Sequence, residues 1–371
     1  MGSSSRTNSR EGTDFILKTI LLTGGGTAGH VMPNLALVPR LRDAGWHVEY
    51  VGSYTGMERQ LVESEGIPYH GVATGKLRRY RDLENLKDPF RVIRGVAQSY
   101  ALIGRLKPTV VFSKGGFVGL PLAVAARLRR VPVILHEADL TLGLANRLAL
   151  PFATKVAVTF AETAASLPKG KAVHTGLPIR REVLSGDGRH LAASYGFTHQ
   201  RPVLLVTGGS SGAKALNEAI WSNLPRLLEH FQIVHLCGRN KTNPDIGNVQ
   251  GYVQIEYAQG EMPDLLAMSQ VVMSRAGSNT IFELLALKKP HLLIPLPASQ
   301  SRGDQIQNAK LFAAHGYSAM VEEEHLASVD LCDTLVQLYE GRESYVQSME
   351  SAPAADGVAE VMKLITSYGR D

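Results

Sequence analysis

Residues 20–30 read ILLTGGGTAGH, and residues 204–214 read LLVTGGSSGAK. In both stretches an apolar run ends at a threonine, a glycine-rich turn follows, and a helical pattern begins. This order is typical of α/β proteins, in which the turn lies at the carboxyl end of a parallel strand. Because the order occurs once in each half of the chain, we predict an α/β fold of two similar domains.

Further apolar runs alternate with helical patterns on either side of these two stretches. They show little alternation of polar and apolar residues, which indicates strands buried on both faces of a parallel sheet. We predict strands within residues 19–23, 48–52, 109–113, 131–136, 155–159, 202–208, 231–238, 270–274 and 290–295. Since ligands of open α/β sheets bind at the carboxyl ends of strands, the two parallel sheets should face a shared cleft.

The domain limits follow from composition. Residues 1–17 are rich in Ser, Arg and Asn without an apolar period, so we expect a leader outside the fold. We expect a first domain over residues 18–178 and a second over residues 179–352. Pro353 to Gly357 interrupts the last helical pattern, so residues 353–371 should form a C-terminal helix that packs back on the first domain.

Composition limits the class of protein. With 371 residues, 44% hydrophobic and 20% charged, the chain is long enough for two cores, and a disordered tail is excluded. Cys237 and Cys332 each lie in an apolar stretch, which is typical of reduced core thiols in a cytoplasmic protein. No apolar run approaches the roughly 20 residues needed to span a bilayer, so we expect the chain not to cross a membrane.

The positive charge of the chain is concentrated in one segment. Residues 76–107 contain nine Lys or Arg and three Asp or Glu, whereas the whole chain has a net charge of only +5. Apolar residues interleave with these cations, namely Leu77, Tyr80, Phe90, Val92, Ile93, Val96, Tyr100, Leu102 and Ile103. This pattern favours a surface that faces anionic lipid over one that binds nucleic acid.

The first glycine turn ends at a histidine. Residues 23–30, TGGGTAGH, match neither the G-x-G-x-x-G spacing of a dinucleotide site nor the GK[ST] of a P-loop, which weakens dehydrogenase and NTPase interpretations. His30 could accept a proton from an attacking hydroxyl, because imidazole titrates near neutral pH. The alternative is a histidine that only caps the helix start, and we favour the catalytic role.

Two further strand ends in the first half carry candidate groups. Gly115 and Gly116 lie in KGGFVGLP, where successive glycines could form a backbone nest for a diphosphate or simply an ordinary tight turn. Glu137 and Asp139 end the next strand, in HEAD. They place carboxylates at the same sheet edge, although either carboxylate could serve only to cap local backbone.

The second half of the chain contains two further features that are typical of anion-binding sites. Ser210 adds a hydroxyl to the turn GGSSG, and SRAGSNTIFELLAL places a helix N-terminus near Ser278 to Thr280, where its dipole favours a phosphate. Glu283 lies one turn further, where it could accept ribose hydroxyls or remain a solvated helix residue. A polar cluster suited to a sugar follows, at Gln300, Arg302, Asp304, Gln305 and Asn308.

Taken in order, seven motifs resemble the MurG family of bacterial glycosyltransferases. They are GGGTAGHVMPNLAL at 24–37, GGFVGLPLAVAA at 115–126, HEADLTLGLANRLA at 136–149, TGLPIRREVL at 175–184, GGSSGAKALNEA at 208–219, RAGSNTIFELLAL at 275–287 and GDQIQNAKLF at 303–312. The resemblance spans residues 19–370. It implies two Rossmann-like domains in the glycosyltransferase-B arrangement.

The resemblance also implies a reaction. N-acetylglucosamine would pass from UDP-N-acetylglucosamine to the 4-hydroxyl of the muramyl sugar of lipid I, with inversion, making lipid II for the peptidoglycan of the cell wall. His30 would be the base. The residues expected to contact the donor are Thr27, Ala28, Gly29, Arg180, Ser210, Ser278, Asn279, Thr280, Ile281, Phe282, Glu283 and Gln305. Gly115, Gly116, Glu137 and Asp139 would lie on the acceptor side, and the family commonly has Asn where this chain has Asp139.

No metal and no cofactor is expected. Asp-x-Asp, which commonly holds a divalent metal at a sugar nucleotide, does not occur in the chain. The charge of the departing diphosphate would then be met by helix termini, hydroxyls and arginine, and Arg180 is a candidate because its planar fork matches phosphate. A solvated linker arginine is the alternative for that residue.

The expected partners are UDP-N-acetylglucosamine, undecaprenyl-linked lipid I and an anionic membrane surface reached through residues 76–107, with no nucleic acid. The protein would lie on the cytoplasmic face of the bacterial membrane, in a pathway that supports cell shape and division. Two other hypotheses keep the fold: a different acceptor such as diacylglycerol, or epimerisation of a sugar nucleotide. A non-catalytic lipid- or nucleotide-binding subunit is a third.

Overall fold

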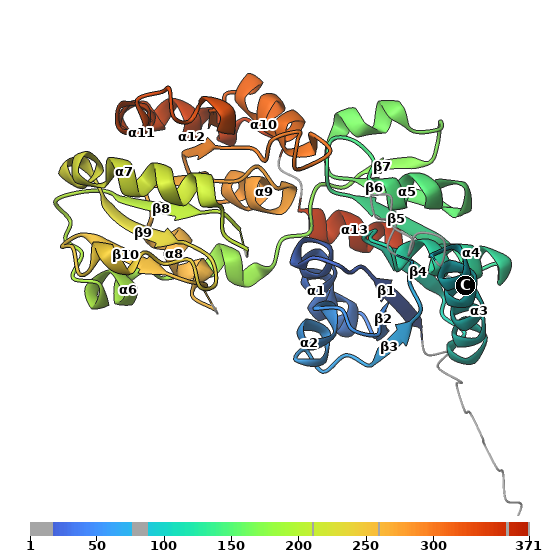
Figure 1. Cartoon of the computed structure of the whole chain (residues 1–371). Coiled ribbons are helices and arrows are strands. Elements are labelled where there is room, and N and C mark those ends of the chain that lie inside the picture. Colours follow the sequence, from blue (N-terminus) through green and yellow to red (C-terminus); the bar gives the residue numbers. More distant parts are fainter. Residues whose placement is uncertain (1–17, 76–87, 210, 259, 354–355, 370–371) are drawn as a thin grey trace, which may run out of the picture.

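The computed structural model describes residues 18–75, 88–209, 211–258, 260–353 and 356–369. Two parallel sheets, each with its own helices, form two domains side by side (Figure 1). This confirms the predicted α/β class with two Rossmann-like halves. The expected leader, residues 1–17, lies outside the described residues.

The first sheet has seven strands in the order β3-β2-β1-β4-β5-β6-β7, all paired in parallel. Its strands are β1 (Thr19–Thr23), β2 (His47–Ser53), β3 (Tyr69–Val72), β4 (Val110–Ser113), β5 (Val133–Glu137), β6 (Lys155–Val158) and β7 (Ala172–His174). The strand β1 is third in this order and pairs with β2 and β4, so the turn that follows it lies between the ends of two neighbouring strands. This position places His30 beside the ends of two neighbouring strands.

The second sheet has six strands in the order β10-β9-β8-β11-β12-β13, again parallel. Its strands are β8 (Val203–Thr207), β9 (Gln232–Leu236), β10 (Tyr252–Ile255), β11 (Val271–Ser274), β12 (His291–Leu293) and β13 (Ala319–Met320). Here β8 is central and carries the second glycine turn, as β1 carries the first. The two sheets therefore have the same strand order, with the strand that carries the glycine turn third from one edge.

Helices cover both faces of each sheet. In the first half of the chain they are α1 (Ala28–Asp43), α2 (Glu58–Glu63), α3 (Asp88–Leu106), α4 (Gly119–Leu128) and α5 (Leu144–Ala149). In the second half they are α6 (Arg189–Ser194), α7 (Lys214–His230), α8 (Met262–Met268), α9 (Ser278–Ala286), α10 (Asp304–Ala314), α11 (Leu331–Glu340), α12 (Arg342–Glu350) and α13 (Gly357–Thr366). None of these described helices is both long and apolar enough to cross a membrane.

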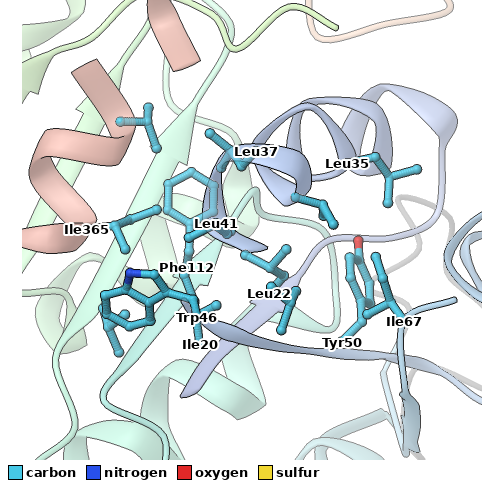
Figure 2. Packing of buried hydrophobic residues seen from close by; sticks show 14 of the residues in the cluster. Ile20, Leu22, Leu35, Leu37, Leu41, Trp46, Tyr50, Ile67, Phe112 and Ile365 are labelled. Carbon is cyan, nitrogen blue, oxygen red and sulfur yellow. The ribbon is translucent and has the colours of Figure 1, made fainter. Parts of the chain in front are cut away.

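The last helix, α13, packs against the first sheet although it follows the second sheet in the chain (Figure 1). Val361 and Ile365 of α13 are fully buried in one core with Ile20, Leu41 and Phe112. Figure 2 shows Ile365 beside Trp46 in this cluster. The chain therefore passes between the domains twice, once after β7 and once between α12 and α13.

The backbone at Gly24 lies so close to His30 and Lys114 that the first glycine turn has no room for a side chain there. A Cβ on Gly24 would lie 2.4 Å from the backbone oxygen of His30 and 3.1 Å from Cβ of Lys114. Any residue with a side chain would therefore push β1, β4 and the start of α1 apart. The turn folds tightly against β4 because it has no side chain at this point.

Candidate active site

A cleft of about 1040 Å³ is lined by residues of both domains, at the carboxyl ends of the strands. The first domain contributes the glycine turn after β1, the turn after β4 and the loop after β5. The second domain contributes the turn after β8, the N-terminus of α9 and the segment before α10. Most residues predicted for the site line this cleft, namely Thr27, Ala28, Gly29, His30, Gly115, Gly116, Glu137, Asp139, Ser278, Asn279, Thr280, Glu283 and Gln305.

His30 lies in the first turn of α1, with its imidazole against Thr27. The Thr27 hydroxyl oxygen is 3.1 Å from Nδ1 of the ring, so this contact occupies one ring nitrogen. The pKa of His30 is lowered to about 4, first by burial and then by the charges of Lys114 and Arg302, while Asp139 and the Gly25 carbonyl act in the opposite direction. The ring is therefore neutral at physiological pH, which is the form that can accept a proton.

A buried carboxylate supports the same turn from behind. Glu58 of α2 is fully buried and accepts hydrogen bonds from the backbone amides of Ser53, at 3.0 Å, and Gly26, at 3.3 Å. Burial alone would raise the pKa of Glu58, but the hydrogen bonds from Ser53 and Gly26 outweigh burial and the pKa is lowered. The Gly26 amide is thus committed to a protein carboxylate, a contact that no local sequence pattern predicts.

The turn after β4 has the geometry of a backbone nest. Gly115 and Gly116 both have positive φ, 92° and 78°, which L-residues with side chains rarely adopt. A Cβ on Gly116 would lie 2.7 Å from the carbonyl oxygen of Gly25, so the second turn packs directly on the first. Lys114, immediately before the two glycines, is buried and lines the cleft. Sequence reasoning missed this lysine.

Glu137 uses its carboxylate to shape the loop after β5. It accepts hydrogen bonds from the amides of Ala138, at 3.1 Å, and Gly143, at 2.9 Å, and from the side chain of Asn146, at 2.9 Å. Burial raises the pKa of this carboxyl group. Glu137 therefore caps local backbone, which was one of the two roles open from the sequence, and Asn146 was not predicted.

Asp139 joins the two domains. Its carboxylate accepts a hydrogen bond from Arg302 at 3.0 Å and one from the Asn308 side chain at 3.2 Å. Asn308 is fully buried and also accepts a hydrogen bond from the Leu140 amide at 3.2 Å. Of the polar cluster predicted before and within α10, Arg302 and Asn308 thus hold the first domain, while Gln300, Asp304 and Gln305 line the cleft.

The N-terminus of α9 faces the cleft from the second domain. The first amides of a helix have no intrahelical acceptor, and the N-cap, Gly277, has no side chain to bond those of Ser278, Asn279 and Thr280. The Asn279 side chain donates to the backbone oxygen of Gly29 at 3.1 Å, which brings this helix end beside α1. Such a terminus attracts anions, because free amides and the helix dipole both point at the ligand.

Glu283 lies one turn further along α9, on the cleft side. Burial raises its pKa to about 7, and the positive charge of Arg180 opposes this shift. Gln305, across the cleft, accepts a hydrogen bond from the Leu296 amide at 3.0 Å through its side-chain oxygen. The side-chain NH₂ group of Gln305 therefore remains the part that can meet a ligand.

Three residues predicted to contact the donor, Ile281, Phe282 and Arg180, do not line the cleft. The Ile281 side chain is fully buried in a core, and Phe282 lines a separate cavity of about 400 Å³. A helix turns about 100° per residue, so these side chains point away from the face of Asn279 and Glu283. Arg180 does not line the cleft, although its charge reaches Glu283. Ser210 lies outside the described residues.

Other charged groups on the cleft wall are held by the protein itself. Arg275 donates to the carbonyls of Ile294, at 3.1 Å, and Pro295, at 3.3 Å, and forms an ion pair with Glu323. Lys241 donates to the carbonyl of Ser211 at 2.8 Å. Neither cation was predicted from the sequence. Within the described ranges, no three His, Cys, Asp or Glu side chains converge as metal ligands would.

Family comparisons cover most of the chain. Residues 20–158 match the glycosyltransferase family 28 N-terminal domain, and residues 203–365 match the family 28 C-terminal domain. A relative from Lachnospira eligens is 52% identical over 94% of this chain and 99% of its own length, and one from Clostridium botulinum is 50% identical over 95% and 99%. Both are named UDP-N-acetylglucosamine–N-acetylmuramyl-(pentapeptide) pyrophosphoryl-undecaprenol N-acetylglucosamine transferase.

Solved structures agree with these matches. The crystal structure of Acinetobacter baumannii MurG is 25% identical, with a TM-score of 0.71 over 94% of this chain and 99% of that one. A UDP-GlcNAc 2-epimerase from Neisseria meningitidis has a TM-score of 0.66 at 16% identity over 95% of this chain and 100% of that one, a likeness of fold alone. The full-length relatives and both family 28 models show that the chain belongs to the MurG family and is a glycosyltransferase.

Proposed function

We propose that the enzyme transfers N-acetylglucosamine from UDP-N-acetylglucosamine to the 4-hydroxyl of the muramyl sugar of lipid I, with inversion and without an essential metal. The product is lipid II, the precursor of peptidoglycan. One observation carries the proposal. His30 and the open N-terminus of α9 meet at one cleft from opposite domains, joined by the hydrogen bond from Asn279 to Gly29.

His30 acts as the base in this mechanism. When Nδ1 carries the proton and donates it to the Thr27 hydroxyl, Nε2 is free to accept a proton from the acceptor hydroxyl. The hydroxyl oxygen attacks the anomeric carbon of the donor sugar. At the same time the bond between this carbon and the diphosphate oxygen breaks, and its electron pair leaves with UDP. A single displacement inverts the configuration at this carbon and needs no covalent intermediate.

The second domain binds the leaving group. The amides of Ser278, Asn279 and Thr280 lack intrahelical acceptors and support a diphosphate at the start of α9. Glu283, one turn on, would accept the ribose hydroxyls, and the Gln305 NH₂ group would donate to the sugar. Fixed amide dipoles stabilise the negative charge that develops on the diphosphate, because they are oriented before the bond breaks.

The first domain supports contact with the membrane. On α3, Phe90 is 74% exposed and Ile93 is 66% exposed, and Arg91 and Arg94 alternate with them. Figure 1 shows α3 on the side of the first domain away from the second domain. An exposed apolar pair between cations fits the interface of an anionic bilayer, where the lipid acceptor lies. Residues 76–87 of the predicted lipid-facing segment lie outside the described residues.

The test is transfer of labelled N-acetylglucosamine from UDP-N-acetylglucosamine to a short-chain lipid I analogue, with and without chelator. The proposal expects a β-linked product, UDP released in equal amount, and rates that persist in chelator. Transfer to diacylglycerol in place of lipid I, or epimerisation of the donor without transfer, would contradict it. UDP binding with no turnover on any acceptor would indicate the non-catalytic subunit instead.

Replacing His30 tests its role directly. His30→Ala should lower kcat by on the order of 100-fold or more, which is the usual contribution of a general base. The affinity for UDP, measured by calorimetry, should change little because the diphosphate site lies on α9. His190→Ala is the matched control, since His190 is an exposed histidine of α6. Near-normal turnover by His30→Ala would rule out the role as base.

A further inference from the structure

Phe160 belongs to the first domain, but its ring lies in a core of the second. It follows β6 closely and is 4% exposed. Its ring centroid lies 4.9 Å from that of Phe282 on α9 and 6.3 Å from that of Phe312 on α10, both edge to face. The buried residues that share its apolar cluster all come from the second domain, namely Ala276, Ile281, Leu293, Ala309 and Phe312. The first domain thus inserts an aromatic side chain between α9 and α10.

Hydrogen bonds fasten the segment of Phe160 to the loop after β5 and to α10. The Thr163 hydroxyl, buried three residues further on, donates to the carbonyl of Leu140 at 2.8 Å. The Leu140 amide donates in turn to the side-chain oxygen of Asn308 at 3.2 Å. Asn308 lies one turn before Phe312 on α10. The ring of Phe160 and the loop of Leu140 therefore meet the same helix at adjacent turns.

The first domain holds α9 from two sides. On the cleft side, the Asn279 side chain donates to the backbone oxygen of Gly29 at 3.1 Å, immediately before His30 in the chain. On the core side, the ring of Phe282 packs against Phe160. The open N-terminus of α9, proposed for the diphosphate, lies at the end of the helix between these two contacts. Its position relative to His30 is therefore set by both.

The space behind Phe160 is not filled. Phe160, Phe282 and Phe312 all line the separate cavity of about 400 Å³. Removal of the Phe160 ring would enlarge this cavity, because a packed core collapses only partly around a deleted side chain. It would also remove one of the two contacts by which the first domain holds α9.

We propose that Phe160 is a positioning residue for the transfer reaction, whose ring fixes the diphosphate site on α9 relative to His30. The inference rests on the proposed roles of His30 and α9. A single displacement needs the acceptor hydroxyl, the anomeric carbon and the departing oxygen in one line. The base comes from one domain and the leaving-group site from the other, so a shift of about 1 Å between them can cost on the order of 100-fold in rate.

The first experiment compares Phe160→Ala with Phe231→Ala. Phe231 is 1% exposed and packs against Tyr339 in a separate core of the second domain. In Phe160→Ala, kcat with a short-chain lipid I analogue should fall by on the order of tenfold or more, because base and donor are no longer aligned. UDP affinity, measured by calorimetry, should stay within about twofold, since the diphosphate and ribose contacts belong to the second domain. Phe231→Ala should change neither quantity.

A milder pair, Phe160→Leu and Phe231→Leu, covers the case in which an alanine variant does not fold, as thermal unfolding would show. Leucine keeps part of the apolar contact but no aromatic ring. Phe160→Leu should therefore lower kcat less than Phe160→Ala does, again without loss of UDP affinity. Phe231→Leu should have near-normal kcat.

The second experiment measures the placement of the domains without turnover. Spin labels at Ser64→Cys and Ser194→Cys report one distance between the domains, because these exposed residues end α2 and α6. The native Cys237 and Cys332 are buried, so labelling should favour the introduced sites. With UDP present, the distance distribution from pulsed electron paramagnetic resonance should broaden or shift in the Phe160 variants. It should remain as in the parent protein in the Phe231 variants.

The outcomes separate this inference from the proposed function. An unchanged distance distribution in the Phe160 variants overturns the inference, whatever their activity, and so does a changed distribution with normal kcat. A loss of UDP affinity as large as the loss of kcat, or an equal loss of kcat in the Phe231 variants, would indicate a merely structural role and would also overturn it. If the parent enzyme does not transfer to lipid I, the proposed function falls, and the distance measurement still decides whether Phe160 sets the placement of the domains.

Discussion

Glu283 lines the cleft, so its protonation state should affect how tightly the donor binds. Burial raises the pKa of this carboxyl group to about 7, so it is ionised above that pH and protonated below it. An ionised carboxylate accepts hydrogen bonds from both ribose hydroxyls, whereas a protonated one has less acceptor capacity. Binding of UDP should therefore weaken as the pH falls through 7, where half of the carboxyl groups are protonated.

We expect this pH dependence to disappear in Glu283→Gln. The amide does not titrate, so UDP affinity measured by calorimetry should be weaker than in the wild type at pH 8 but nearly constant from pH 6 to pH 8. The loss at pH 8 should be on the order of tenfold, the value of one or two hydrogen bonds to a charged group. A wild-type affinity that does not change between pH 6 and pH 8 would contradict the role of the carboxylate.

At the scale of residues, the sequence identified the turns better than the groups that support them. His30, Gly115 and Asn279 belong to motifs with a chemical reason for their position, and all three line the cleft. Lys114 and Glu58 do not, because a lysine or glutamate is usually solvated and only the packing of neighbouring strands buries these two. Burial of a charged side chain is a tertiary property that local pattern does not carry.

At the scale of elements, the nine strands predicted from apolar runs are the inner strands of both sheets. The four strands that the sequence pattern missed, β3, β7, β10 and β13, are the edges. Inner strands are buried on both faces and need continuous apolar residues, whereas an edge strand such as β7, with two half-buried residues and one exposed, does not. Continuous apolar runs therefore predict every strand of the two sheets except the two edge strands of each.

The helix α9 illustrates a second limit. Its motif, from Ser278 to Glu283, was assigned to the donor as a block, but its side chains divide between the cleft and the interior. Asn279 and Glu283 are one turn apart and share the cleft face, while Ile281 packs in the core between the domains. Helical period alone could have separated these residues once the direction of the core was known.

The apolar pair on α3 leads to a prediction about membrane binding. Phe90→Ser combined with Ile93→Ser should reduce affinity for vesicles containing anionic lipid by on the order of tenfold or more, because each buried side chain contributes about 1.5–3 kcal/mol. Vesicle co-sedimentation measures this affinity. Turnover on a water-soluble acceptor analogue should remain near normal, since α3 does not line the cleft.

Leu184→Ser is the matched control for that double variant. Leu184 is 50% exposed but lies in the second domain, away from α3. Its replacement should leave vesicle binding unchanged. Equal binding of wild type to neutral and anionic vesicles would remove the electrostatic part of the membrane proposal, and unchanged binding of the double variant would remove the apolar part.

At the scale of the whole molecule, the two domains are joined by more than the chain. The contacts of Asp139 with Arg302 and Asn308, and of Asn279 with Gly29, all cross the cleft. They lie next to His30 and α9, so the groups proposed for proton transfer and diphosphate binding are aligned by the same contacts that hold the domains together. Long-range pairs of this kind are invisible in local sequence patterns.

The helix α13 provides a prediction about stability. Ile365→Ala should lower the free energy of unfolding by about 2–5 kcal/mol, because it leaves a cavity in the fully buried core of the first sheet. Denaturant unfolding followed by tryptophan fluorescence measures this loss, since Trp46 lies in the same core. Lys363→Ala, on the exposed side of α13, should change stability by less than about 0.5 kcal/mol. Equal effects of the two variants would contradict the packing described for α13.

The return of α13 to the first sheet also reverses the order in which the domains can be finished on the ribosome. Residues of the first sheet emerge early, yet the apolar surface that receives Val361 and Ile365 stays uncovered until α13 has been translated. The second sheet and helices α6 to α12 form one continuous stretch of chain and can close before that. The nascent enzyme therefore completes its later half first, and a chain released shortly before residue 357 would carry an exposed apolar groove open to aggregation or chaperone capture.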